Sequence, residues 1–218
     1  MSAGYDADSD DYNTPGQAGQ WMQIDDWSPY IQKVPMKRKP GRQWVYGDLN
    51  SQLVGLIIET QSGMSLSEFA QKHLFGPIDM KEYYWQQSQA GSTVASGNLF
   101  LRGIDFAKLA WLVLREGNWQ GQQLMSKEYV KDMTGKQISI DPDYFGVPVD
   151  YGYFWYTRTR NIGGKDYTYH YASGNGGNYM IVVPSENMVI SLMSSAYGPY
   201  HGHGRSMRIF EKVIEALK

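Results

Sequence analysis

The chain has 218 residues, and its 20 lysine and arginine residues nearly balance 22 aspartate and glutamate residues. A net charge of −2 argues against a general nucleic-acid binder or a protein of anionic membrane surfaces. The absence of cysteine excludes disulfides, thiolate metal sites and cysteine nucleophiles. Apolar residues make up 42%, with no run long enough to span a bilayer, so the length suits one substantial domain or two small ones.

The N-terminal part of the chain predicts little regular structure. Residues 1–43 are rich in Asp, Gly, Ser and Pro. They begin without the basic residues and apolar stretch of a signal peptide, and the compartment stays open. Large apolar side chains are expected to anchor this region, namely Trp21, Met22, Trp27 and Tyr30.

The aspartates near the start have the opening spacing of a calcium loop. Asp6, Asp8 and Asp10 alternate as the first three ligands of such a loop would. The sixth position is Asp11 where glycine is needed, and the twelfth is Gln17 where glutamate is needed. A solvated acidic loop is therefore favoured over a calcium site.

The histidines give no firm metal site either. His201 and His203 alternate in a glycine-rich stretch but lack an evident third ligand, so a turn is favoured over chelation. His170 lies on a predicted strand just before a glycine-rich turn, and it faces either a site or the sheet surface. No metal and no cofactor are expected.

Four helices are predicted in the middle of the chain, from capping residues and apolar spacing. The first begins at an Asp48 N-cap and ends at Gly63, and the second opens with a capping box over 65–68 and runs to about residue 74. The third covers 103–115, and the fourth runs from a Ser126 cap to about Met133.

The second half predicts short strands and a final helix. Strands are expected at 151–157, 167–171, 179–183 and 189–193, separated by Gly, Asn and Pro turns. Such close spacing implies antiparallel neighbours, and a helix follows from about Ser206. The predicted class is α+β, an α/β sandwich in which helices flank an antiparallel sheet.

Two segments together resemble one family. The first reads Trp44-Val-Tyr46-Gly-Asp48, followed by a helix with Leu-Val-Gly-Leu-Ile-Ile-Glu, and the second reads Tyr171-Ala-Ser-Gly-Asn-Gly-Gly-Asn178. They resemble the Tyr-x-Asn motif with its helix, and the Lys-Thr-Gly or His-x-Gly strand, of serine β-lactamases and penicillin-binding proteins. The branch with class C-like esterases, D-aminopeptidases and 6-aminohexanoate-dimer hydrolases is most similar. The resemblance runs through nearly the whole chain and implies a β-lactamase/transpeptidase-like fold.

The departures from this family are informative. Its nucleophile is the serine of Ser-x-x-Lys, and no serine in these 218 residues has lysine three positions later. Asp48 stands where asparagine is common, and Ala172 where lysine or histidine is common. The resemblance therefore implies a single incomplete domain over 1–218, without the nucleophile segment and N-terminal strands. Its parts are a loop and helical region, 1–135, and a sheet with the C-terminal helix, 136–218.

The resemblance assigns catalytic roles to Tyr46 and Asp48. Tyr46 is expected to relay a proton, for which a phenol with an ordinary pKa of about 10 needs a cationic neighbour. Asp48 either orients the missing lysine by its charge or simply caps its helix. Without the resemblance, a packed or surface aromatic would be the favoured interpretation of Tyr46.

The resemblance assigns substrate-binding roles to the turn after the third predicted strand. Ser173 and Gly174 are expected to line the strand beside the substrate, and the Asn175 N–H to be one oxyanion donor. Gly176, together with Gly177, would let the turn pass without obstruction. These residues and Tyr46 are expected to converge on one cleft.

Two functions remain open at this point. The first is part of a serine hydrolase that acts through an acyl-enzyme on a small-molecule β-lactam, D-alanyl peptide, carboxylic ester or short oligoamide. Such a part is expected to be inactive alone. The second is a non-catalytic module that binds a ligand or completes a partner chain. Uncovered sheet edges and helix faces predict association with an N-terminal piece or with a second copy.

Overall fold

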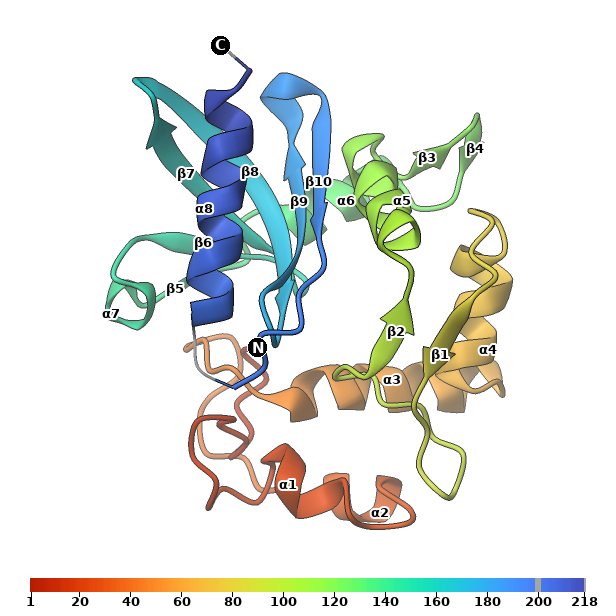
Figure 1. The fold of residues 1–218 in the computed structure, drawn as a ribbon. Helices are drawn as coiled ribbons and strands as arrows, with labels where there is room; N and C mark the ends of the chain where they lie inside the picture. Colours follow the sequence, from red (N-terminus) through yellow and green to blue (C-terminus); the bar gives the residue numbers. More distant parts are fainter. Residues whose placement is uncertain (199–200, 218) are drawn as a thin grey trace. The chain divides into compact units, whose positions relative to one another are not determined.

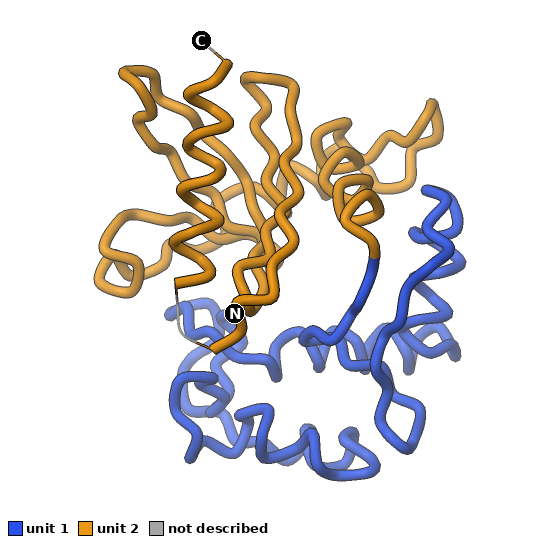
Figure 2. The backbone as a smooth tube through the Cα atoms, viewed as in Figure 1, with its two compact units in different colours: residues 1–101 blue, residues 102–218 orange. Residues whose placement is uncertain are grey.

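The computed structural model describes residues 1–198 and 201–217. The chain forms two compact units, Met1–Leu101 and Arg102–Lys218, which Figure 2 colours separately. Helices lie in both units, and a large antiparallel sheet lies in the second (Figure 1). The predicted α+β class is therefore confirmed, while the assignment of 1–218 to a single incomplete domain stays a prediction.

The first unit consists mainly of helices and loops. Its elements are α1 (Ala18–Trp21), α2 (Ser28–Ile31), α3 (Asp48–Ser62), α4 (Leu66–Ala70), the π-helix η1 (Gln71–Phe75), β1 (Tyr83–Trp85) and β2 (Leu99–Leu101). The predicted capping box is present, because the Ser65 side chain accepts a hydrogen bond from the Glu68 N–H and the Glu68 side chain accepts one from the Ser65 N–H. Gly63 ends α3 in the left-handed conformation, as predicted.

A buried glutamine fastens α3 to the loop that precedes β2. Gln52 is fully buried; its Nε2 donates to the Thr93 carbonyl over 2.9 Å, and its Oε1 accepts from the Ala95 N–H over 2.9 Å. The helix approaches this loop so closely that a Cβ on Gly55 would lie 2.5 Å from the Ala95 Cβ. Side-chain and backbone polar groups thus replace water inside the unit.

The N-terminal region is largely irregular, as predicted, and it is tied down by two tryptophans. Trp21 and Trp27 are buried, and their rings meet edge to face with centroids 5.3 Å apart. They join a core cluster with Ile31 and Leu49, so the loop region packs on α3. The expected anchoring role of these two side chains is confirmed.

The second unit is built on a six-stranded antiparallel sheet in the order β10-β9-β8-β7-β6-β5. Its strands are β5 (Ile138–Ile140), β6 (Val149–Tyr151), β7 (Tyr156–Ile162), β8 (Lys165–Gly174), β9 (Asn178–Val183) and β10 (Met188–Leu192). The other elements are α5 (Gly103–Leu114), β3 (Asn118–Trp119), β4 (Gln122–Gln123), α6 (Lys127–Thr134), α7 (Pro142–Phe145), the 3₁₀ turn η2 (Pro184–Glu186) and α8 (His201–Glu215).

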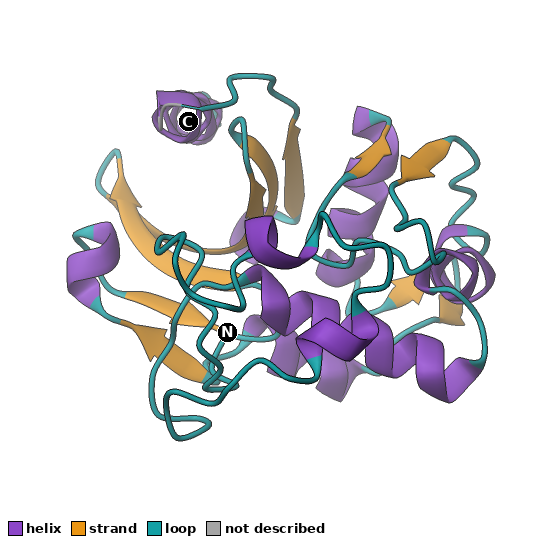
Figure 3. Ribbon diagram, turned by 90° about the horizontal axis from the view of Figure 1, so that it is seen from below, coloured by secondary structure: helices purple, strands orange, loops and turns teal. Residues whose placement is uncertain are grey.

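Helix α8 covers one face of this sheet, as Figure 3 shows with the helix seen end-on. Alternate residues of β8 point toward it, because successive side chains of a strand lie on opposite faces. Tyr167, Tyr169 and Tyr171 are buried there, and Tyr169 packs on Phe210 of α8 with ring centroids 4.7 Å apart. This aromatic layer is the core between the sheet and α8.

Helices α5 and α6 pack on the opposite face. Met180 and Val182 of β9 join a buried cluster with Ala110 and Val113 of α5 and Val130 of α6. Successive side chains of β9 alternate between the two faces of the sheet, so Tyr179 and Val183, next to Met180 and Val182, lie on the α8 face. The helices predicted over 103–115 and 126–133 are confirmed, and Ser126 caps α6 as expected.

Two predicted elements in this unit are wrong in their bounds. The strand predicted over 151–157 is the end of β6 and the start of β7, joined by a turn. Phe154 takes a positive φ of 64° there, and a Cβ on Gly152 would lie 2.0 Å from the Met133 carbonyl oxygen. The final helix begins at His201 instead of near residue 206, so His201 and His203 lie in a helical turn and not in an irregular one.

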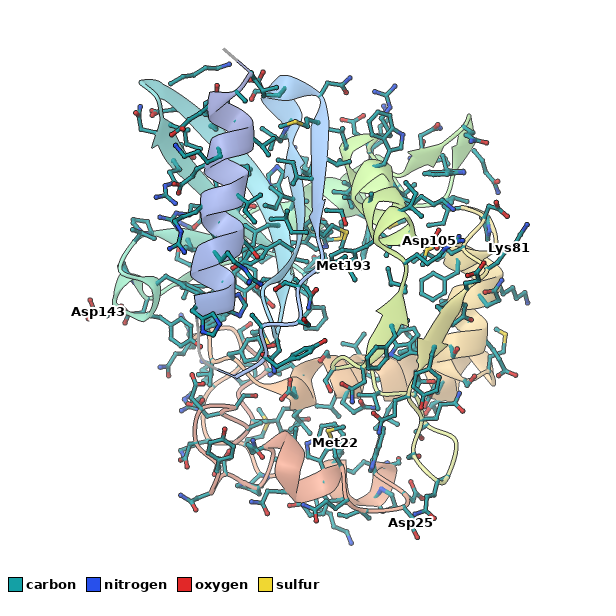
Figure 4. The ribbon with its side chains drawn as sticks, in the orientation of Figure 1. Met22, Asp25, Lys81, Asp105, Asp143 and Met193 are labelled. Atoms are coloured by element: carbon teal, nitrogen blue, oxygen red, sulfur yellow. The ribbon has the colours of Figure 1, made fainter. Side chains whose placement is uncertain are left out.

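A buried carboxylate holds the start of α5, where Figure 4 labels it. Asp105 is fully buried; its Oδ2 accepts from Arg102 Nε over 2.8 Å, and its Oδ1 lies 2.8 Å from Lys108 Nζ. Burial raises the pKa of Asp105, but hydrogen bonds and charges from Arg102 and Lys108 outweigh it and hold the pKa below its ordinary value. Such a group stabilises the fold above its unfolded pKa, and the stabilisation is lost as pH falls through the folded pKa.

We expect Asp105→Asn to lower the free energy of unfolding by about 1.5–3 kcal/mol at neutral pH, the usual effect of hydrogen bonds to a charged group. The lower end is favoured because solvent screens Arg102, which is half exposed. Urea unfolding at a series of pH values should show the two proteins converging in acid. Glu116→Gln, which removes the exposed partner of Lys127, is the control and should change little. Equal losses in both variants would contradict this assignment.

Candidate active site

The segment that carries Tyr46 and Asp48 enters α3 against the N-terminal loop. Gly47 is the N-cap of α3 in an extended conformation, and a Cβ there would lie 2.0 Å from the Ala7 carbonyl oxygen. The Tyr46 carbonyl accepts a hydrogen bond from the Ser9 N–H over 2.9 Å. The loop and the helix start therefore hold each other in place, and only glycine fits between them.

Asp48 does not cap its helix as predicted. It is the first helical residue, and the Gly47 cap makes no side-chain hydrogen bond. The Ser9 hydroxyl replaces the cap, because its Oγ accepts from the Asp48 N–H over 3.2 Å and donates to Asp48 Oδ2 over 3.1 Å. Sequence reasoning missed Ser9 since it lies 39 residues before Asp48 and carries no local capping signal.

The surroundings of Tyr46 oppose its ionisation. Burial raises the pKa of the Tyr46 phenol to about 12, and the nearby charges of Asp48 and Asp10 add to the rise. Burial also raises the pKa of Asp48, partly offset by its hydrogen bond from Ser9. At neutral pH the phenol is protonated, and the charges that act on it most are carboxylates.

We expect the Tyr46 phenol to titrate near pH 12 and Asp48→Asn to lower that midpoint, because the variant removes one of the two charges but leaves the burial. Ultraviolet phenolate absorbance of the wild type minus that of Tyr46→Phe isolates this one tyrosine. The same subtraction in the Asp48→Asn background gives the shifted value. A wild-type midpoint near the ordinary value of about 10, or an upward shift in the variant, would contradict this description.

The predicted substrate-binding residues form the end of β8 and its turn into β9. Ser173 pairs with Tyr179 and Gly174 with Asn178 across the two strands. Asn175 is exposed, and its carbonyl accepts from Asn178 Nδ2 over 2.7 Å. No group in 1–198 and 201–217 accepts a hydrogen bond from the Asn175 N–H. Among the described residues, the Asn175 N–H is thus a backbone donor without a partner.

Two glycines allow the turn to lie against α8. Gly176 and Gly177 both have φ of 87°, a conformation that favours glycine. A Cβ on Gly177 would lie 2.5 Å from the Gly202 carbonyl oxygen. Ser206 Oγ donates to the Gly177 carbonyl over 2.6 Å in a buried position. The main chains of the turn and the helix are therefore in direct contact.

The two residues before Gly174 belong to opposite faces of the sheet. Ser173 follows the alternation of Tyr171 and lies on the α8 face, opposite Tyr179. Ala172 packs against the apolar cluster of α5 and α6. This packing gives a physical reason for the departure at 172, because a lysine there would bring its charge to an apolar core.

Two histidines make hydrogen bonds within the second unit. The Thr157 hydroxyl donates to the Thr134 carbonyl over 2.6 Å and lies 2.7 Å from His170 Nδ1. Its single hydrogen is therefore used, and His170 Nδ1 must be the donor. His203 Nδ1 lies 3.0 Å from the Tyr179 hydroxyl. His170 lies between Tyr169 and Tyr171 in β8, so its side chain is on the face of the sheet opposite α8, next to Thr157 of β7.

Neither an ion site nor a membrane span is found in the described part of the chain. Within residues 1–198 and 201–217, no three His, Asp or Glu side chains gather where they could hold a metal ion. The same residues contain no helix of the length and apolar character needed to cross a bilayer.

Comparisons with known proteins identify the family. The Beta-lactamase family profile matches residues 1–212, so the chain belongs to the β-lactamase family, a family of serine hydrolase-like proteins. This confirms the resemblance drawn from the Tyr46 and Ser173 segments. The profile covers both units of the structure.

Solved structures share the fold at low sequence identity. A protein described as a 6-aminohexanoate-dimer hydrolase from Bacillus anthracis has 19% identity and a TM-score of 0.78, over 99% of this chain and 60% of that one. A penicillin-binding protein from Bacillus halodurans has 19% identity and a TM-score of 0.67, over 100% of this chain and 71% of that one. The β-lactamase/transpeptidase-like fold is thereby confirmed.

A curated relative matches a shorter stretch. The N-acetylmuramyl-L-alanine amidase of Bacillus subtilis (strain 168) is 28% identical over 82 residues, which are 37% of this chain and 19% of that protein. The chain thus spans less than two thirds of both this relative and the Bacillus anthracis structure.

The predicted site residues fall in different units. Tyr46 and Asp48 lie in the first, and the Ser173–Gly176 turn lies in the second. Their catalytic and substrate-binding roles, and their convergence on one cleft, stay predictions.

Proposed function

We propose that this chain supplies the proton relay and an oxyanion donor of a serine hydrolase that cleaves an amide or ester bond through an acyl-enzyme. Acyl transfer of this kind needs a nucleophile, a base or relay and an oxyanion hole. The observation that carries the proposal is the family match over residues 1–212, which includes both the Tyr46 segment and the β8–β9 turn. No Ser-x-x-Lys occurs in the sequence, so the chain alone is proposed to be inactive.

Tyr46 is proposed as the relay, and Asp48 as the residue that positions a lysine beside it. The raised pKa of Tyr46, about 12, leaves almost no phenolate at neutral pH, so Tyr46 is a poor base without a cation beside it. A lysine ammonium close by would lower that pKa, and the carboxylates of Asp48 and Asp10 would attract it. The electrostatics of the segment thus suit a cation, and none of the described residues supplies one that lowers the Tyr46 pKa.

The β8–β9 turn is proposed to hold the acyl group. The unpaired N–H of exposed Asn175 is suited to donate to an oxyanion, since a donor that is already in place when the charge develops needs no rearrangement. Ser173 and Gly174 would line the substrate along β8, and Gly176 leaves the far side of the turn without a side chain. The contacts with α8 at Gly177 give this donor a rigid support.

The substrate class is proposed as an ester or a neutral amide. β-Lactam, D-alanyl peptide, carboxylic ester and short oligoamide substrates share the acyl-transfer chemistry. The first two carry a carboxylate that favours a cation nearby, and Ala172 supplies none. Its packing against the apolar cluster of α5 and α6 supports this preference.

A second candidate is a non-catalytic module that binds a ligand or completes a partner chain. One observation favours it: burial and two nearby carboxylates raise the pKa of Tyr46, whereas a relay needs a cation that lowers it. The partner would be an N-terminal polypeptide or a second copy of this chain.

Sequencing the coding region upstream of Met1 separates the two candidates. An in-frame Ser-x-x-Lys upstream of Met1 supports the hydrolase. A stop codon without such a motif in that frame overturns it and favours the non-catalytic module.

A further inference from the structure

The turn between β8 and β9 contains the only Asn-Gly pair of the sequence, Asn175–Gly176. Asn175 is exposed. Among the described residues, neither its side-chain amide nor the Gly176 N–H takes part in a hydrogen bond. The residue that follows the asparagine carries no side chain, so nothing on it shields the peptide nitrogen. Both reacting groups for an attack of the main chain on the amide are therefore free.

Five other asparagines are held differently. Their side-chain amides form hydrogen bonds, and none of them is followed by glycine. These residues are Asn50, Asn98, Asn118, Asn161 and Asn178. Asn178 is the sharpest contrast, because it lies in the same hairpin. Its Nδ2 donates to the Asn175 carbonyl, and its Oδ1 accepts from the Ser194 N–H over 2.8 Å.

We propose that Asn175 is a site of spontaneous deamidation in the folded protein. The Gly176 nitrogen attacks Asn175 Cγ, and the new C–N bond closes a succinimide ring. The bond from Cγ to the side-chain nitrogen breaks, and ammonia leaves with the proton that Gly176 loses. Water then opens the ring at either carbonyl carbon and returns a proton to the nitrogen. The products are aspartate and isoaspartate, and neither an oxidant nor a further reactant is required.

The reaction changes a turn that tolerates little change. Isoaspartate adds one methylene to the main chain just before Gly176, whose carbonyl accepts from the Ala196 N–H over 3.2 Å. The next residue, Gly177, lies against the main chain of Gly202, and its carbonyl accepts a hydrogen bond from Ser206 Oγ. We expect the turn to separate from α8 in the modified protein. This inference goes beyond the proposed function and does not depend on it.

The test is to incubate the folded 218-residue chain in mildly alkaline buffer made with heavy-oxygen water and to map its peptides by mass spectrometry. The expected result is conversion at Asn175, with one heavy oxygen gained per event, while Asn178 in the same peptide stays an amide. Asn175→Gln should lose the conversion and keep the wild-type circular dichroism. An intact Asn175 in a sample that deamidates elsewhere, or equal rates at Asn175 and Asn178, would overturn the proposal.

Discussion

Gly177→Ala should destabilise the second unit more than any other single methyl addition to the β8–β9 turn. The substitution forces alanine into a φ of 87° and brings its Cβ to 2.5 Å from the Gly202 carbonyl oxygen. An unfavourable φ costs about 1–3 kcal/mol and overpacking about 1–3 kcal/mol more, so the expected loss is about 2–6 kcal/mol. Urea unfolding followed by tryptophan fluorescence measures this loss directly.

Gly164→Ala is the matched control, because the chain offers the same backbone angle without the contact. Gly164 has a φ of 86°, and a Cβ there would meet nothing within 4 Å. It should lose only the backbone part, about 1–3 kcal/mol. If both substitutions cost the same, the close contact between the turn and α8 is not present, and the turn is not supported as described.

Gln52→Leu should have a comparably large effect on the first unit. The change leaves the buried Thr93 carbonyl and the partly buried Ala95 N–H without their partner. An unsatisfied buried group costs about 1–3 kcal/mol and a partly buried one less, so we expect a loss of about 1–5 kcal/mol. Chemical denaturation gives the total, and hydrogen exchange at the Ala95 amide locates the weakened contact. Gln61→Leu, at an exposed position of the same helix, should change little.

Gln52→Glu makes this prediction sharper. The carboxylate can still accept from Ala95, but only the protonated form can donate to Thr93. Because burial raises the pKa of such a carboxyl, its folded pKa lies above the unfolded value, and the variant should lose stability as pH rises through the folded pKa. A stability of Gln52→Glu relative to wild type that does not depend on pH would contradict the pairing.

Local sequence signals predicted the elements that local contacts define. The capping box at Ser65 and Glu68, the Ser126 cap and the Gly63 stop all lie within a few residues of the helices they bound. The apolar spacing of α5 likewise matches its buried face. Each of these features depends on the backbone of one segment, so the sequence pattern was sufficient.

Contacts between distant segments account for the errors. The run 151–157 has strand-like side chains throughout, yet the Met133 backbone next to Gly152 requires a turn there. The cap of α3 comes from Ser9, and the start of α8 lies against Gly177. Strand β5 has only three residues and is defined by its pairing with β6. None of these partners is adjacent in sequence, so no local pattern indicates them.

In the candidate site, too, sequence motifs predicted the segments but not the properties that depend on distant contacts. Motif resemblance identified Tyr46 and the Ser173–Gly176 turn, and the family profile includes both segments. The sequence did not reveal the electrostatics. Burial, with smaller contributions from two nearby carboxylates, raises the pKa of Tyr46. Ala172 packs against an apolar cluster, which gives a reason for the missing lysine or histidine. These properties depend on burial and on neighbours from other elements.

We propose that this chain holds part of an acyl-transfer site but not the Ser-x-x-Lys nucleophile of the family. The most direct test is to incubate the folded 218-residue chain with a fluorescent penicillin and, separately, with a fluorescent fluorophosphonate. A penicillin-binding protein that contains Ser-x-x-Lys serves as the positive control. We expect no covalent label on the chain under conditions that label the control fully. Stoichiometric labelling of any serine would contradict the claim, and Ser173 is the first residue to inspect by peptide mapping.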